Sequence, residues 1–146
     1  MKIERKYADL KYREKRCDNI EYIVIQSFTD KDTSHYQIID GKVYQMLPDN
    51  ILSASVNGGR LNQYGILHGI CTKYNSITIG VKDDPENDDI ELCKHLIMTL
   101  RQRHKIKENN IIRQIDITGE VSPKIWFDKD KWEKDIIIAL KNMLED

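Results

Sequence analysis

The sequence has few cysteines and no long apolar run, and each of these absences narrows the class of protein. Its three cysteines, Cys17, Cys71 and Cys93, are odd in number and widely spaced among 146 residues. This pattern argues against a disulfide framework and for free thiols in a reducing compartment. No apolar segment approaches the roughly 20 residues of a membrane-spanning helix, and no signal peptide is recognisable at the start. We therefore expect a soluble, cytoplasmic protein without a membrane partner.

The chain also lacks an excess of charge of either sign, with 23 basic and 24 acidic residues. Residues 1–16 are the exception, because seven Lys or Arg against three Asp or Glu leave a local excess of four positive charges (7 − 3). A nearly neutral chain has no electrostatic footprint for nucleic acid, so we expect no nucleic-acid partner. We interpret residues 1–19 as a solvated basic arm and residues 20–146 as one domain.

Hydrophobic patterns predict alternating strands and helices. Residues 21–26 are typical of a strand buried on both faces of a sheet, and residues 35–47 predict a hairpin around Asp40-Gly41. Residues 75–81 and 111–113 predict further strands, and a helix is expected to start with an aspartate cap and Pro85 as its first residue. Apolar spacing at 132–143 predicts a last amphipathic helix. This pattern indicates an α/β fold, with a central mixed β-sheet flanked by helices.

Four short segments carry a resemblance to a known family: IVIQ at 23–26, SHYQIIDGKVYQMLPDN at 34–50, NSITIGVK at 75–82 and RQIDITGEVSP at 113–123. Over about residues 20–126 the chain resembles the type 2 N-acetylmuramoyl-L-alanine amidases, which share a fold with the peptidoglycan-recognition proteins. In that family the first segment ends in a zinc-binding histidine, and the third supplies an acidic residue. The last segment supplies a second histidine and a cysteine or aspartate. The resemblance implies a single amidase-like domain.

The residues that the resemblance assigns to the zinc site are replaced in this chain. Gln26 and Gln114 take the places of the histidines, and Ser122 takes that of the third ligand. Lys82 replaces the acidic residue, and Glu120 replaces a lysine of the last segment. A catalytic zinc needs about three imidazole, thiolate or carboxylate donors. We therefore expect no metal, no cofactor and no hydrolysis by the family mechanism. Instead, we expect a polar cluster in which the two glutamines bond to each other or to the serine.

If the family's geometry carries over, a shallow groove lies over the strand ends near these positions. Further candidates for ligand contact are His35, Asn57, Asn75, Ser76 and Trp126. Only residues 27–34 separate the first strand from the hairpin, where the family has a helix, so one wall of the groove is trimmed. The long irregular connection at 49–74 is of a kind that is usually functional or disordered.

Three functions remain open from the sequence. The leading one is a catalytically inactive amidase-like domain that recognises peptidoglycan stem peptide or muropeptide. The second is a protein-interaction scaffold, for an active amidase or a phage or sporulation component, with the basic arm and residues 50–74 as contact surfaces. The third is an active peptidoglycan amidase with an atypical site, which a measurement of zinc content would distinguish from the other two.

Overall fold

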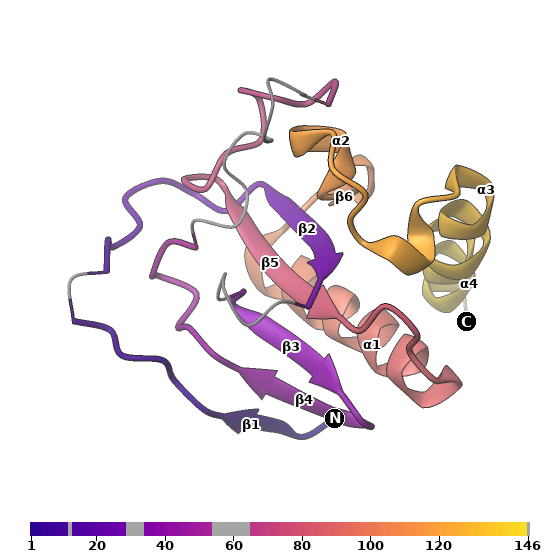
Figure 1. The fold of residues 1–146 in the computed structure, drawn as a ribbon, viewed down its shortest axis with the longest axis horizontal. Helices are drawn as coiled ribbons and strands as arrows, with labels where there is room; N and C mark the ends of the chain where they lie inside the picture. Colours follow the sequence, from indigo (N-terminus) through magenta and orange to yellow (C-terminus); the bar gives the residue numbers. More distant parts are fainter. Residues whose placement is uncertain (12, 29–33, 54–64, 146) are drawn as a thin grey trace.

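The computed structural model describes residues 1–11, 13–28, 34–53 and 65–145, which form a six-stranded mixed sheet with helices (Figure 1). The strands are β1 (Ile3–Arg5), β2 (Tyr22–Ser27), β3 (Tyr36–Ile39), β4 (Lys42–Gln45), β5 (Ser76–Val81) and β6 (Ile111–Arg113). Their order across the sheet is β1-β4-β3-β5-β2-β6. Among these strands only β3 and β4 pair antiparallel, and the other neighbours are parallel. The predicted α/β class with a central mixed sheet is confirmed.

Two long helical segments follow β5 and β6. The first is α1 (Asn87–His104), and the second runs through α3 (Lys129–Trp132), a π-helical segment η5 (Glu133–Ile138) and α4 (Ala139–Glu145). Shorter turns are η3 (Glu108–Asn110), α2 (Ile115–Thr118) and η4 (Lys124–Trp126). The α1 helix starts two residues later than predicted, because a capping box of Glu86 and Asp89 sets its first turn and Pro85 stays outside it.

Helix α1 lies across one face of the sheet (Figure 1), and Ile136 and Leu140 of the C-terminal helical segment belong to the same main hydrophobic core. Alternate residues of the central strands point into this core, including Ile23 and Ile25 of β2 and Ile77 and Ile79 of β5, all at 0% exposure. Each fully buried side chain of this size contributes about 1.5–3 kcal/mol. This layer therefore fixes the positions of the central strands, and with them the direction of the residues on the opposite face.

A smaller cluster covers the opposite face, where Val24 of β2 meets Ile112, Ile117 and Cys71. Because side chains alternate along a strand, Gln26 points to the same face as Val24. The three cysteines are free thiols in the structure. Burial raises the pKa of the Cys71 and Cys93 thiols to about 12, so both behave as small apolar side chains.

The predicted hairpin around Asp40-Gly41 is confirmed, with positive φ angles of 50° and 76° at the two turn residues. The first residues differ from the expected solvated arm. Strand β1 pairs in parallel with β4 at one edge of the sheet, and Arg16 donates hydrogen bonds of 3.0 and 2.8 Å to the carbonyls of Asp49 and Ser76. The start of the chain is thus attached to the domain. Among the described residues, none of the helices has the length and apolar character that crossing a membrane requires.

Candidate functional site

Three of the predicted positions meet where β2 and β6 end. Gln26 is the next-to-last residue of β2, and the backbone N–H of Gln114 donates to the carbonyl of Ile25 over 2.8 Å. The Ser122 hydroxyl accepts a 2.9 Å hydrogen bond from the backbone N–H of Ser27. The structure therefore brings Gln26, Gln114 and Ser122 together, and we refer to them with Ser27 as the strand-end site.

Residues other than these hold the loop that forms the site. Asp116 accepts hydrogen bonds of 3.1 Å from the backbone N–H and from the guanidinium of Arg113. The same guanidinium donates to the carbonyls of Trp126 and Phe127, each over 3.0 Å. Gly119, with a φ of 75°, ends α2 in the left-handed conformation that glycine favours. Contacts within the protein thus hold the loop backbone in place.

The predicted polar cluster is wrong for Gln26. This side chain is only 2% exposed, and its Oε1 has no hydrogen-bond partner. It therefore accepts no bond from Gln114 or Ser122. On the neighbouring strand β5 the residue in register with it is Gly80, which has no side chain. The amide oxygen is left buried and unpaired at the end of a central strand.

The donors of the strand-end site do not fit zinc. Two amides and two hydroxyls carry no charge, whereas zinc sites are built from imidazole, thiolate and carboxylate groups. The hydroxyl of Ser122 already accepts a bond from the backbone of Ser27. In the part of the chain that the structure describes, no group of three or more His, Cys, Asp or Glu side chains is placed to hold a metal ion.

The other two replaced positions lie differently. Lys82 follows the end of β5, and its ammonium forms a 3.0 Å ion pair with Asp40. The residue of β5 in register with Gln26 is Gly80, two positions before Lys82. Glu120 follows α2, and its backbone N–H donates to the Thr118 hydroxyl over 3.2 Å.

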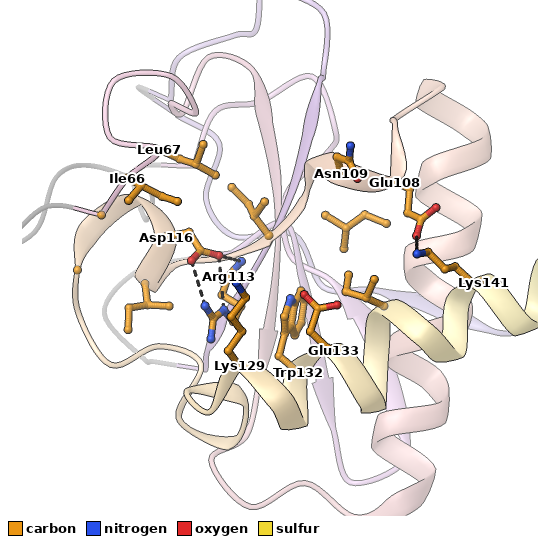
Figure 2. A pocket seen from close by; sticks show the side chains of 16 residues that line it. Ile66, Leu67, Glu108, Asn109, Arg113, Asp116, Lys129, Trp132, Glu133 and Lys141 are labelled. Atoms are coloured by element: carbon orange, nitrogen blue, oxygen red, sulfur yellow. Dashed lines mark hydrogen bonds and ion pairs between the residues drawn. The ribbon is translucent and has the colours of Figure 1, made fainter.

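Cavities occur elsewhere on the molecule. One of about 760 Å³ lies between β6, α2 and the C-terminal helical segment (Figure 2). Another of about 540 Å³ lies at the end of α1, beside residues 19–21. Neither of the two is lined by Gln26, Gln114 or Ser122, so neither is the shallow groove that was predicted over the strand ends.

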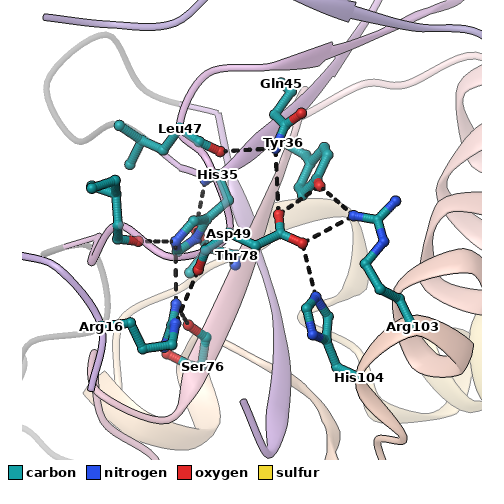
Figure 3. A network of polar contacts seen from close by, with 11 residues as sticks. Arg16, His35, Tyr36, Gln45, Leu47, Asp49, Ser76, Thr78, Arg103 and His104 are labelled. Carbon is teal, nitrogen blue, oxygen red and sulfur yellow. Dashed lines mark hydrogen bonds and ion pairs between the residues drawn. The ribbon is translucent and has the colours of Figure 1, made fainter. Parts of the chain in front are cut away.

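His35 is buried in a polar network and is not available as a ligand-binding residue (Figure 3). Its Nε2 lies 2.6 Å from the carbonyl oxygen of Ile51, and its Nδ1 lies 3.0 Å from the Thr78 hydroxyl. Burial lowers the pKa of His35 to about 4, and the nearby Arg16 guanidinium acts in the same direction. The ring is therefore neutral near pH 7, and both of its nitrogens have partners within the protein.

The remaining predicted contacts do not gather at the strand-end site. Ser76 is in register with Tyr22, four residues before Gln26 and thus about 13 Å away along the strand. Asn75 precedes it, and its side chain accepts from the backbone N–H of Thr72 over 2.8 Å. Trp126, expected as an exposed contact, is 0% exposed and donates a 3.0 Å hydrogen bond to Asp135. Asn57 lies outside the described residues.

Sequence reasoning missed Asp49 as the centre of the polar network (Figure 3). Its carboxylate accepts from the Tyr36 hydroxyl at 2.7 Å and from Arg103 at 2.9 Å, and it lies 2.8 Å from His104 Nε2. Burial acts to raise the pKa of Asp49, but these hydrogen bonds outweigh it and hold the pKa below its ordinary value. The partners lie 13, 54 and 55 positions away, so no local motif marks them.

Comparisons with known proteins show the fold. A mutant endolysin from Bacillus subtilis matches with a TM-score of 0.74 and 18% identity, over 95% of this chain and 98% of that chain. The catalytic domain of XlyA matches with 0.72 and 16%, over 96% and 99%. The N-acetylmuramoyl-L-alanine amidase LysC from Clostridium intestinale matches with 0.59 and 13%, over 93% and 99%. No family model and no curated protein matches the sequence. At these identities the likeness shows a shared fold.

Proposed function

We propose that this chain is a peptidoglycan-related, amidase-like domain that recognises stem peptide or muropeptide without hydrolysing it. The shared fold supports a peptidoglycan-related, amidase-like domain, because an endolysin and an N-acetylmuramoyl-L-alanine amidase have the same fold. The observation that supports the absence of hydrolysis is the set of donor groups at the ends of β2 and β6. There Gln26, Gln114 and Ser122 meet without an imidazole, thiolate or carboxylate among them.

Binding and hydrolysis make different demands on this fold. A zinc amidase needs the ion to activate water and to polarise the amide carbonyl, and neutral side chains supply neither effect. Binding needs only shape and hydrogen bonds, which a fold can retain after its reaction is lost. Because no step depends on a metal, binding to peptidoglycan is expected to be independent of zinc.

Co-sedimentation with purified peptidoglycan sacculi tests the proposal. The fraction of protein in the pellet is measured with added zinc and with a chelator, and the supernatant is assayed for released fragments. We expect pelleting in both conditions and no release. Protein that stays in the supernatant contradicts wall recognition, and fragment release contradicts inactivity.

A matched pair of variants locates the binding surface. Lys124 is exposed, and its backbone N–H donates to the hydroxyl of Ser27 over 3.1 Å, beside the strand-end site. Lys134 is exposed on the C-terminal helical segment. Because stem peptides carry carboxylates, Lys124→Glu is expected to reduce the pelleted fraction, whereas Lys134→Glu is expected to leave it unchanged.

A protein-interaction scaffold is the second candidate, and two exposed apolar side chains favour it. Ile66 is 88% exposed and Ile70 is 58% exposed, within the region at 50–74 expected to form contacts. Contiguous patches of exposed apolar side chains mark interaction sites, and these two side chains lie four positions apart in one connection. If sacculi fail to bind, a pull-down with the wild-type chain and with an Ile66→Ser, Ile70→Ser variant tests this candidate, since a specific partner should be lost with the variant.

A further inference from the structure

The cavity beside β6 is a built feature that the proposed function does not use. It lies between β6, α2 and the C-terminal helical segment, and we call it the β6 cavity (Figure 2). Its volume of about 760 Å³ falls within the range of about 300–1,000 Å³ that is usual for small-ligand sites. The strand-end residues do not line it, so it constitutes a separate candidate site.

Apolar side chains make up much of its wall. Ile111 and Ile112 of β6 line it from the sheet, and Trp132 and Ile137 line it from the helical segment. The ring of Trp132 packs at 61° against Trp126, with 5.7 Å between the centroids, and is only 4% exposed. The wall is thus backed by the core and does not need a ligand to keep its shape.

Charged side chains surround this apolar wall, and most of them neutralise each other. Asp116 pairs with Arg113 at 3.1 Å, and Glu108 pairs with Lys141 at 3.5 Å. Lys129 and Glu133 also line the cavity. Within the residues that the structure describes, the side chains of these two have neither an ion pair nor a hydrogen bond.

The two unpaired charges are opposite in sign and come from the same helical segment. Lys129 and Glu133 are four positions apart in one continuous helical run, which places their Cα atoms about 6 Å apart along its axis. Figure 2 draws both among the residues that line the cavity, on either side of Trp132. A ligand in the cavity therefore meets a free ammonium and a free carboxylate, with an aromatic ring between them.

The edge of β6 limits how a ligand can be held. β6 is the last strand of the sheet, but the N–H of Ile111 donates to the carbonyl of Glu108 and the N–H of Arg113 donates to the Asp116 carboxylate. These N–H groups are therefore not available to pair with an added strand. Side chains rather than a backbone ladder must hold the ligand.

We propose that the β6 cavity binds a short zwitterionic peptide of about two residues. Its ammonium pairs with Glu133, its carboxylate pairs with Lys129, and an apolar side chain lies against Ile111, Ile137 and Trp132. An extended chain advances about 3.5 Å per residue, so a dipeptide is about as long as the helical turn that separates the Cα atoms of Lys129 and Glu133. A purely anionic or purely cationic ligand would leave one of the two charges unpaired. This proposal does not depend on the function proposed for the strand-end site.

A charged and a capped form of one dipeptide provide the test. Alanyl-leucine is titrated into the ¹⁵N-labelled full chain, followed by N-acetyl-alanyl-leucine amide, which has the same side chains and no charge. We expect saturable shifts of the Gly119 and Lys129 amides and of the Trp132 indole with the charged form only. Equal binding of both forms, or no saturable shift with alanyl-leucine, overturns the proposal.

Three variants then assign the charges. Lys129→Gln and Glu133→Gln are each expected to weaken binding of alanyl-leucine by about fivefold, whereas Lys134→Gln, outside the cavity, should leave it unchanged. The dispersion of each variant's own spectrum shows whether it is folded. N-acetyl-leucine and leucine amide, which each carry one charge, should bind more weakly than the dipeptide. Equally tight binding of either one, or unchanged binding by both cavity variants, overturns the paired recognition.

Discussion

Gln26 of β2 lies in register with Gly80 of β5, so the amide at the end of one central strand faces a neighbour without a side chain. The Oε1 of this buried amide has no hydrogen-bond partner. A buried polar atom left unpaired costs about 1–3 kcal/mol. The site that a metal ligand would occupy in the resembling family is therefore a weak point of this fold.

Replacing Gln26 by an apolar residue of similar shape should consequently not destabilise the protein. We predict that Gln26→Met leaves the free energy of unfolding unchanged or raises it by up to about 1 kcal/mol, measured by urea denaturation. Thr78→Val is the contrast, because its hydroxyl accepts a 2.9 Å hydrogen bond from the His35 backbone; it should lower stability by about 1–2 kcal/mol. A clear loss of stability in Gln26→Met would show that the amide has a partner in solution.

The pH dependence of stability should reveal the buried His35. Its pKa is about 4 in the folded protein and about 6.5 in an unfolded chain, so the unfolded state binds the proton first as pH falls. Stability is fully present above pH 6.5 and decreases from there toward pH 4, by about 2 kcal/mol between pH 7 and pH 5. His35→Gln should be less stable at pH 7 but have a flatter profile between these two values, and an equally steep profile would contradict this assignment.

Removing the charge of Asp49 should destabilise the network in Figure 3. The Asp49→Asn variant keeps the shape of the side chain but leaves Arg103 and His104 without their carboxylate, at contacts of 2.9 and 2.8 Å. We expect a loss of about 1–2 kcal/mol in the free energy of unfolding, because the side chains are partly exposed and screened. Asp130→Asn, at an exposed position, serves as control and should change stability by less than about 0.5 kcal/mol.

Gly65 makes a close approach to α2 that no other residue can make without displacement. A Cβ at this position would lie 2.3 Å from the carbonyl carbon and oxygen of Asp116. Gly65→Ala should therefore cost about 1–3 kcal/mol and shift the amide resonances of Ile115–Thr118. Val121→Ala, at a 58% exposed position three residues after α2, should do neither. Wild-type stability in Gly65→Ala would mean that the two segments do not pack as described.

The parts of the fold that sequence patterns predicted are those with strong local signals. The β-branched run of β2, the Asp40-Gly41 turn and the apolar stripe through Trp132 and Ile136 each depend on neighbouring residues. Strand β1 has no such signal, because three residues gain strand structure only by pairing with β4, about 40 positions away in the register Ile3 to Val43. Nonlocal pairing of this kind leaves little trace in one sequence.

In the candidate site, too, some positions could be predicted from the sequence and others could not. The four segments named above predicted that Gln26, Gln114 and Ser122 lie close together, and the backbone bonds of Gln114 to Ile25 and of Ser27 to Ser122 place them so. Local contacts of Asp116 hold the loop that connects Gln114 to Ser122. His35 and Trp126 were expected as candidates for ligand contact, but both are 0% exposed. Their burial depends on packing against residues such as Ile51 and Trp132, which the sequence alone does not place beside them.

The central claim, that the strand-end site holds no zinc, is tested most directly by the metal content of the purified chain after incubation with zinc and dialysis. A triple variant, Gln26→His, Gln114→His and Ser122→Cys, provides the positive control, since it supplies three donors of the right chemistry at these positions. We predict nearly no zinc in the wild-type chain and close to one ion per chain in the variant. Close to one ion per wild-type chain would contradict the account and restore the reading of an active amidase with an atypical site.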